Sequence, residues 1–394
     1  MIGLILERGL NMKTILFDLL ATQQGLHGAK FTGGGEYIKT VFKKLCEITG
    51  EDNKTRIITF YNSTLFIDEW IKELIDTYNI ENYDVSCYED VTKLSVLQEV
   101  DTFFEGLLYL PAKYELPAHI RTIGVFHGFR MLELPTDKTA YLYENGIKRK
   151  AINLVKYIFE EKYYERQLKK QRVTINRCDI IVGVSKHSGY AAQMFFPEYD
   201  ANKIKVFYSP LKYTPIVDDI DSVCTKHIIL MLGGNRWEKN VYRGIKAIDE
   251  LFSAGQLEGY SVKVVGGIPK SIKAKIINKD RFVALGYLTP EDLERVYKEC
   301  EIFFYPTLNE GFGYPPLEAM KYNKTCVVAA DTSLPEIYKD SVYYCNPYDV
   351  KEMKTRILQA KQEKISEELI KMHYKRITDK EKDDLLALCE LILE

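Results

Sequence analysis

The sequence contains no long apolar run, no closely spaced pair of cysteines and no excess of charge of either sign. Its 54 basic residues nearly balance its 56 acidic residues, which gives a formal net charge of −2 and argues against nucleic acid as a partner. No apolar run approaches the roughly 20 residues that a membrane-spanning helix needs. The 8 cysteines are scattered, as is typical of reduced core residues rather than of a disulfide framework or a zinc site. These absences predict a cytoplasmic protein.

Short apolar runs alternate with longer amphipathic stretches, which is the pattern of an α/β protein with parallel sheets. In the first half of the chain, strands are expected at residues 14–17, 56–60, 84–87, 122–126, 179–184 and 203–207. In the second half, they are expected at residues 227–232, 261–265, 281–285, 301–305, 325–328 and 342–345. Helices are expected at residues 36–47, 148–176, 240–252, 290–300, 316–322 and 350–362.

The stretch 209–226 interrupts this alternation with prolines and aspartates, and we interpret it as a linker. The sequence therefore predicts an N-terminal Rossmann-like domain at 1–212 and a C-terminal one at 213–377. A last helical pattern at 378–394 is expected to return to the first domain. Such doubly wound units bind ligands at the carboxyl ends of their strands.

The most informative string is EGFGYPPLEAM, which begins at Glu310 and follows an apolar strand. Gly311 and Gly313, on either side of Phe312, allow a tight turn and a close approach of the backbone to a ligand. Glu318 falls in the helix that follows, whose N-terminus offers N–H groups to phosphate or hydroxyl oxygens. A carboxylate accepts hydrogen bonds through two oxygens and therefore suits neighbouring sugar hydroxyls.

This string resembles the signature of retaining glycosyltransferase family 4, which carries two glutamates eight residues apart, here Glu310 and Glu318. The resemblance implies the GT-B fold, in which two Rossmann-like domains face each other across a cleft. It implies donor binding by the C-terminal domain, with Glu310 on the sugar and Glu318 on the ribose, and no metal ion. One departure is Asn323, which stands where the family usually has glycine, and asparagine tolerates the positive φ required there.

A second cluster, GGNRWEKN, follows the strand expected at 227–232 and contains Gly234, Arg236 and Lys239. Arginine and lysine bind phosphate oxygens, and cations fixed here would stabilise a departing nucleoside diphosphate. The family resemblance implies this role for Arg236 and Lys239. The alternative interpretation is a surface pair of cations bound to Glu238.

In the first domain, Gly33 and Gly34 follow the first strand, and the resemblance places them near the donor phosphates. His127 ends the strand expected at 122–126, where it could hydrogen-bond a sugar hydroxyl. Asp219-Ile220-Asp221 resembles a metal-binding DxD motif. No strand precedes it, so we interpret it as solvated charge and predict no metal site.

Residues 148–172 are rich in lysine, arginine and aromatic residues. Two interpretations are open for this segment: peripheral contact with the inner face of a membrane, where lipid-linked acceptors reside, and a solvated helix that covers the N-terminal domain.

The sequence thus predicts a metal-independent, retaining hexosyltransferase for polysaccharide biosynthesis, with no bound cofactor. It would move a sugar from a UDP- or GDP-sugar, as co-substrate, to a saccharide or lipid-linked saccharide. The catalytic residues would be Glu310, His127, Arg236 and Lys239. Two alternatives are open. One is a nucleotide-sugar epimerase of the same fold. The other is a non-catalytic nucleotide-sugar-binding subunit of a transferase.

Overall fold

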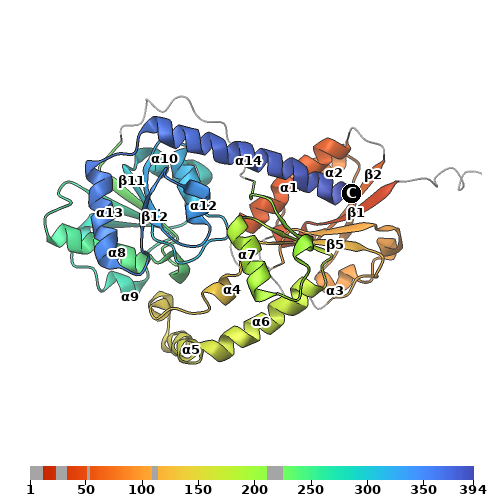
Figure 1. Ribbon diagram of the computed structural model, residues 1–394, viewed down its shortest axis with the longest axis horizontal. Helices are drawn as coiled ribbons and strands as arrows, with labels where there is room; N and C mark the ends of the chain where they lie inside the picture. Colours follow the sequence, from red (N-terminus) through yellow and green to blue (C-terminus); the bar gives the residue numbers. More distant parts are fainter. Residues whose placement is uncertain (1–11, 24–32, 51–53, 109–113, 211–224) are drawn as a thin grey trace, which may run out of the picture. The chain divides into compact units, whose positions relative to one another are not determined.

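The computed structural model describes residues 12–23, 33–50, 54–108, 114–210 and 225–394. The expected domain boundary at 212–213 and the Asp219-Ile220-Asp221 motif lie outside the described residues. The described residues form two compact units (Figure 1). The N-terminal unit takes its residues from Met1–Phe129, Leu168–Tyr213 and Thr378–Glu394, and the C-terminal unit from Arg130–Gln167 and Thr214–Ile377. Residues 130–167, placed in the first domain by the sequence, thus cluster with the C-terminal unit.

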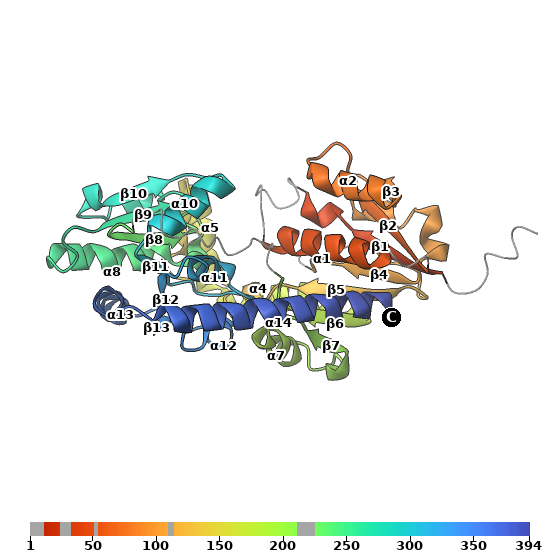
Figure 2. The same ribbon diagram turned by 90° about the horizontal axis from the view of Figure 1, so that it is seen from above.

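The N-terminal unit is built on a parallel seven-stranded sheet in the order β3-β2-β1-β4-β5-β6-β7, which Figure 2 shows from one edge to the other. Its strands are β1 (Lys13–Asp18), β2 (Thr55–Tyr61), β3 (Glu81–Asp84), β4 (Thr102–Glu105), β5 (Arg121–Phe126), β6 (Ile180–Gly183) and β7 (Ile204–Val206). The sequence missed β4 entirely, and the strand expected at 84–87 is wrong because β3 ends at Asp84.

Helices cover the N-terminal sheet. They are α1 (Gly33–Thr49), α2 (Glu69–Thr77), α3 (Tyr88–Val91) and α7 (Lys186–Phe195). Alternate residues of a strand face opposite sides of the sheet, so each strand contributes side chains to the apolar cores on both sides. Phe17 of β1 packs against Phe42 of α1 on one side, whereas its neighbour Leu16 belongs to a separate apolar cluster with Phe60 and Phe103.

The C-terminal unit has a parallel six-stranded sheet in the order β10-β9-β8-β11-β12-β13. Its strands are β8 (Ile228–Leu232), β9 (Ser261–Val265), β10 (Phe282–Leu285), β11 (Ile302–Tyr305), β12 (Thr325–Ala329) and β13 (Tyr343–Cys345). All six strands expected from the sequence are confirmed. The unit's helices are α4 (Arg130–Glu133), α5 (Ile147–Ile158), α8 (Val241–Ser253), α9 (Lys270–Lys273), α10 (Pro290–Glu299), α11 (Tyr314–Met320), α12 (Leu334–Tyr338) and α13 (Val350–Gln362).

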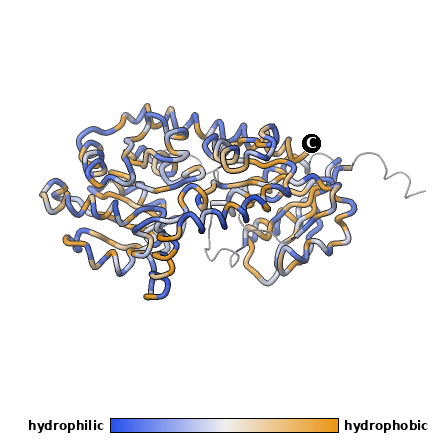
Figure 3. Tube along the Cα trace, turned by 60° about the horizontal axis from the view of Figure 1, so that its bottom comes forward, coloured by the Kyte–Doolittle hydropathy of each residue, from blue (hydrophilic) through white to orange (hydrophobic). Residues whose placement is uncertain are grey.

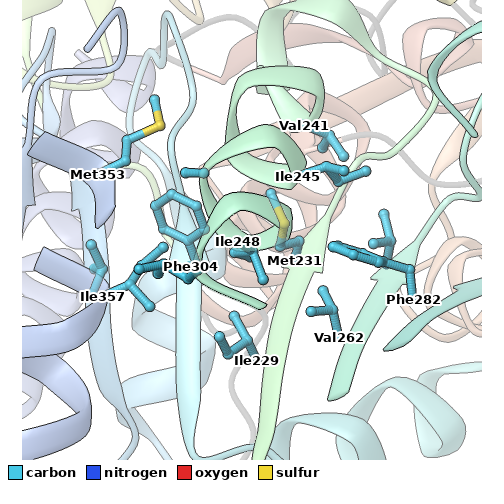
Figure 4. Close-up of a cluster of buried hydrophobic side chains, with 14 of the residues drawn as sticks. Ile229, Met231, Val241, Ile245, Ile248, Val262, Phe282, Phe304, Met353 and Ile357 are labelled. Carbon is cyan, nitrogen blue, oxygen red and sulfur yellow. The ribbon is translucent and has the colours of Figure 1, made fainter. Parts of the chain in front are cut away.

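One apolar core of this unit lies between its sheet and helices α8 and α13 (Figure 4). Ile245 and Ile248 of α8 and Ile357 of α13 pack there against Met231 and Phe304 of the central strands. These side chains are at most 2% exposed. Figure 3 colours the trace by hydropathy and shows apolar and polar segments alternating along the chain.

Two helices run from one unit into the other: α6 (Glu160–Asn176) and α14 (Glu367–Leu393). The single helix expected at 148–176 is wrong, because Phe159 leaves the helical conformation between α5 and α6. The end of α14 packs on the N-terminal unit, where Arg121 donates a hydrogen bond of 3.0 Å to the Leu391 carbonyl and the Tyr208 amide donates one of 2.7 Å to Asp384.

Candidate functional site

The strand order of the C-terminal sheet identifies where a ligand is expected. All six strands are parallel, but the side on which the chain adds them changes at β8: β9 and β10 lie on one side of it and β11 to β13 on the other. Doubly wound sheets bind ligands at the carboxyl ends of the strands at such a switch point. The loop after β8 carries Gly233, Gly234 and Arg236, and the single helical turn Trp237–Lys239 follows. The loop after β11 carries Glu310. The topology therefore brings the two clusters chosen from the sequence to one edge of one sheet.

Gly234 lies where two loops meet. Its amide donates a hydrogen bond of 2.9 Å to the Val265 carbonyl at the end of β9. A Cβ at Gly234 would lie 1.7 Å from the carbonyl oxygen of Gly267, a backbone atom that cannot move aside alone. Only glycine allows this close approach, which supports a structural reason for the glycine next to the basic pair.

We expect Gly234→Ala to separate these loops, to cost about 1–3 kcal/mol of stability and to weaken nucleotide binding. Gly286→Ala is the matched control, because Gly286 directly follows β10 of the same sheet and a Cβ there meets nothing within 4 Å. Thermal unfolding with and without nucleotide checks both variants. Equal behaviour of the two would show that the contact with Gly267 does not matter.

Lys239 and Glu310 form the centre of the site. The Lys239 Nζ lies 2.5 Å from Oε1 of Glu310 and 2.8 Å from the Tyr305 hydroxyl. The same Oε1 accepts hydrogen bonds of 2.6 Å from Tyr305 and 2.9 Å from Thr307. Among the described residues, none donates to the second oxygen, Oε2. One carboxylate oxygen thus fixes the side chain, and the other is left for a ligand.

The backbone around Glu310 is held from the loop after β12. The Glu310 amide donates to the Thr332 hydroxyl at 3.0 Å, and the Ser333 hydroxyl donates to the carbonyls of Glu310 and Phe312 at 3.1 and 3.0 Å. Gly313 has φ of 93°, and a Cβ there would lie 2.5 Å from the Leu334 side chain. The turn that carries Glu310 is therefore fixed before any ligand arrives.

Glu318 has a different environment. It lies on α11, and the Tyr297 hydroxyl donates a hydrogen bond of 2.6 Å to its Oε2. Burial raises the pKa of Glu318, and the bond from Tyr297 opposes that rise only in part. The structure gives Glu310 and Glu318 separate partners, so each can bind its own group.

Arg236 is bound to Glu238, at 2.6 Å from Nη2 to Oε1. Burial alone would raise the pKa of Glu238, but the positive charges of Arg236, Arg130 and Lys239 outweigh it and lower that pKa. Glu238 therefore binds the guanidinium of Arg236, the group that the sequence analysis assigned to phosphate binding. Because the Arg236 side chain is 56% exposed, it is accessible to an anion that competes with Glu238.

Sequence reasoning missed Tyr305, Thr307 and a contact from a remote segment. Glu133 on α4 accepts a hydrogen bond of 2.8 Å from the side-chain Nδ2 of Asn309, next to Glu310. Tyr305 could have been found, since it ends the apolar strand just before the motif. The contact between Glu133 and Asn309 could not, because no local pattern joins residues that are 176 positions apart.

In the N-terminal unit the structure brings Gly34 and His127 together. A Cβ on Gly34 would lie 3.7 Å from the His127 Nε2. That nitrogen lies 3.0 Å from the Gly106 carbonyl, which only accepts, so Nε2 carries the proton. Burial lowers the pKa of His127 to about 4, so the imidazole is neutral at pH 7 and Nδ1 is an acceptor. The neighbouring Gly33 begins α1.

The lowered pKa of His127 makes the stability of the protein depend on pH. Between pH 6.5 and about 4, the unfolded imidazole binds a proton that the folded one refuses, so stability falls as the pH falls through this window. We expect the loss to reach at most about 3 kcal/mol.

His127→Gln keeps a donor to Gly106 without the titration, so its stability should not show this loss. Burial raises the pKa of Asp18 to about 7, so the contribution of Asp18 to stability increases as the pH falls, opposite to that of His127. Asp18 is present in both proteins, and its contribution cancels in their difference. Urea unfolding at several pH values measures that difference, and a pH-independent difference would contradict the assignment.

The described part of the chain contains no group of three His, Cys, Asp or Glu side chains arranged to hold a metal ion. Of its seven described cysteines, all but Cys87 are buried, and each is a free thiol. Within the described ranges, no helix is long and apolar enough to cross a membrane.

Comparison with known proteins identifies related sequences and related folds. Residues 217–376 match the family model described as glycosyl transferases group 1. The serotype-specific mannosyltransferase WbdA of Escherichia coli is 38% identical over 80 residues, which is 20% of this chain and 10% of WbdA. The O-antigen chain mannosyltransferase RfbU of Salmonella typhimurium is 25% identical over 205 residues, which is 50% of this chain and 55% of RfbU. The chain therefore spans only about a tenth to a half of these relatives.

Solved structures extend the likeness to the whole fold. HepE of Anabaena, in complex with UDP-glucose, superposes with a TM-score of 0.62 at 15% identity, covering 96% of this chain and 99% of HepE. None of these comparisons favours an epimerase or a non-catalytic subunit. The chain thus has the GT-B fold throughout, and in sequence its C-terminal unit resembles the group 1 glycosyltransferases.

Proposed function

We propose that this protein transfers a hexose from a UDP- or GDP-sugar to a saccharide or lipid-linked saccharide acceptor. The observation that carries the proposal is the Lys239–Glu310 pair at the switch point of the C-terminal sheet. A fixed cation and a carboxylate with one available oxygen match the two ends of a nucleotide sugar, namely its phosphates and its sugar hydroxyls. Because relatives of this chain are named mannosyltransferases, we propose mannose as the first sugar to test.

In this proposal, the diphosphate binds to Lys239 and displaces Glu238 from Arg236. Both cations then neutralise the charge that develops as the nucleoside diphosphate leaves. Glu318, held by Tyr297, accepts hydrogen bonds from the ribose hydroxyls. Gly234 and the turn Gly311–Gly313 allow the donor to approach the backbone.

Glu310 would accept hydrogen bonds from the transferred sugar. Three donors already bind its Oε1, and this stabilises the anion and lowers its nucleophilicity. We therefore propose that the acceptor hydroxyl attacks the anomeric carbon from the face of the departing diphosphate. The phosphate takes the hydroxyl proton, and the configuration is retained without a metal ion. In the N-terminal unit, Gly33 and Gly34 would contact the phosphates, and the neutral His127 would accept a hydrogen bond from a sugar hydroxyl.

Thermal unfolding of the protein with a panel of UDP-, GDP-, ADP- and CMP-sugars, including GDP-mannose, tests the proposal. Each sugar is added once with EDTA and once with Mg²⁺. A ligand at 100 times its Kd adds about 2.7 kcal/mol to the stability, which raises Tm by a few degrees. We expect one nucleotide family to do this in EDTA. Stabilisation that requires Mg²⁺ would contradict the metal-independent site, and stabilisation by none of them would contradict the donor site itself.

A further inference from the structure

Helix α5 turns its apolar side to solvent. None of its residues is buried. Ile147, Leu154 and Ile158 recur at spacings of seven and four residues, which places them on one side of the helix, and they are 88%, 53% and 63% exposed. Val155 and Ala151 are exposed on the same side. We call these five residues the α5 stripe. A surface helix of a globular protein normally packs such a stripe against the core.

The side of α5 that faces the protein is polar instead. Lys150 donates a hydrogen bond of 3.0 Å to the Ser271 hydroxyl, and Asn153 donates one of 3.3 Å to Glu144. Lys156, one turn further, is also partly buried. The helix is therefore inverted relative to an ordinary amphipathic surface helix, so its exposed stripe is a built feature of the C-terminal unit and not a frayed end.

Charge indicates what covers the stripe. The helix contains four cationic residues and no acidic residue, although the chain as a whole has a net charge of −2. Lys148 and Arg149 are exposed, and so are the aromatic residues Tyr157 and Phe159. A second copy of α5 would bring like charges together. An anionic lipid surface instead offers phosphates to the cations, an apolar layer to the stripe and an interface that aromatic rings favour.

We propose that α5 lies on the surface of an anionic membrane, with the α5 stripe inserted among the headgroups and Lys148, which flanks the stripe, on the lipid phosphates. The sequence analysis considered membrane contact for the whole basic segment 148–172, and this proposal assigns the contact to α5 alone. The proposal goes beyond sugar transfer and does not depend on it. It does, however, give a physical reason why a lipid-linked acceptor would be met at a membrane.

Flotation of the full chain with vesicles tests the proposal. The vesicles contain equal amounts of phosphatidylglycerol and phosphatidylcholine, or phosphatidylcholine alone. We expect binding to the first and little to the second. Lys148→Gln should weaken binding about five-fold at low salt. Leu154→Ser with Ile158→Ser should weaken it more than ten-fold at any salt concentration. Circular dichroism and Tm confirm that each variant is folded.

Matched controls come from the same unit. Lys279→Gln removes an exposed cation elsewhere, and Ile277→Ser removes an exposed apolar side chain from the loop that follows α9. Both should bind vesicles like the wild type. Wild-type protein that ignores anionic vesicles, or α5 variants that bind as well as the controls, would overturn the proposal. So would light scattering that shows a dimer abolished by Leu154→Ser, since a second copy would then cover the stripe.

The two proposals fail independently. Vesicle binding is measured without donor, and Glu310→Gln should leave it unchanged. The α5 variants should keep the thermal stabilisation by nucleotide sugar, because α5 contributes no residue to the donor site.

Discussion

Replacing Glu310 by glutamine is expected to lower the rate of sugar transfer about 100- to 1,000-fold while nucleotide binding changes only a few-fold. Glutamine keeps the shape of the side chain but removes the negative charge that Lys239, Tyr305 and Thr307 surround. Lys239 then loses its counter-ion inside the site and keeps the hydroxyl of Tyr305 as a neutral partner. The diphosphate of a donor can still bind Lys239, so the loss should appear in kcat and not in nucleotide affinity.

Glu291→Gln is the matched control, because Glu291 is an exposed carboxylate on α10 of the same unit. It should change neither turnover nor binding. Single-turnover kinetics with the donor identified by thermal unfolding separates the two effects. Full turnover by Glu310→Gln would contradict the role proposed for Glu310. A loss of nucleotide binding that matches the loss of turnover would instead assign Glu310 to the nucleotide.

Asp137→Ala is expected to destabilise the C-terminal unit by about 3–5 kcal/mol. Asp137 lies 2.9 Å from Arg243 of α8, and both side chains are 6% exposed. Arg243 also donates a hydrogen bond to the side-chain oxygen of Asn240. The side-chain nitrogen of Asn240 in turn donates to the carbonyls of Pro306 and Pro347. Removing the carboxylate leaves a buried guanidinium without its counter-ion and loosens the segment that carries Glu133.

Tryptophan fluorescence during urea unfolding measures this effect. In a Trp70→Phe background, Trp237 of the C-terminal unit is the sole tryptophan and reports that unit alone. The double variant Asp137→Ala with Arg243→Met should cost less than Asp137→Ala, because no buried charge is stranded. Asp292→Ala breaks an exposed pair with Arg295 and should cost less than about 1 kcal/mol. An equal cost for Asp137→Ala and Asp292→Ala would contradict the account of the buried pair.

Much of the C-terminal unit could be predicted from the sequence because its strands are short, mostly apolar runs, and β8, β9, β10 and β11 each end directly before a glycine or a proline. The run Ile302–Tyr305, for example, ends at Pro306. The positive φ expected at Asn323 is confirmed at 54°. Strand β4 could not be read in the same way. It has four residues and ends in Glu105, a buried charge that is neutralised by Arg177, 72 positions away. A local pattern does not contain such a partner.

The candidate site also contains residues that the local sequence predicts and contacts that only the fold reveals. Three candidates could be chosen from the sequence because a phosphate site is expected to need glycine and cations after a strand: Gly234, Arg236 and Lys239. Glu310 could be chosen because it opens the string EGFGYPPLEAM. The three-way contact at Oε1 of Glu310 depends on two neighbouring strands and had to come from the fold. Residues 130–167 cluster with the C-terminal unit through contacts that a local pattern does not contain, such as the long-range polar pair of Asp137 and Arg243.

Hydrogen–deuterium exchange with the stabilising nucleotide sugar tests the central claim most directly, because it locates the donor without a mutation. The account predicts slower exchange in two stretches, Gly233–Lys239 after β8 and Pro306–Gly313 after β11, with little change at the opposite end of the same strands. If the donor raises Tm while both stretches exchange as in the free protein, the donor binds elsewhere and the site proposed here is wrong.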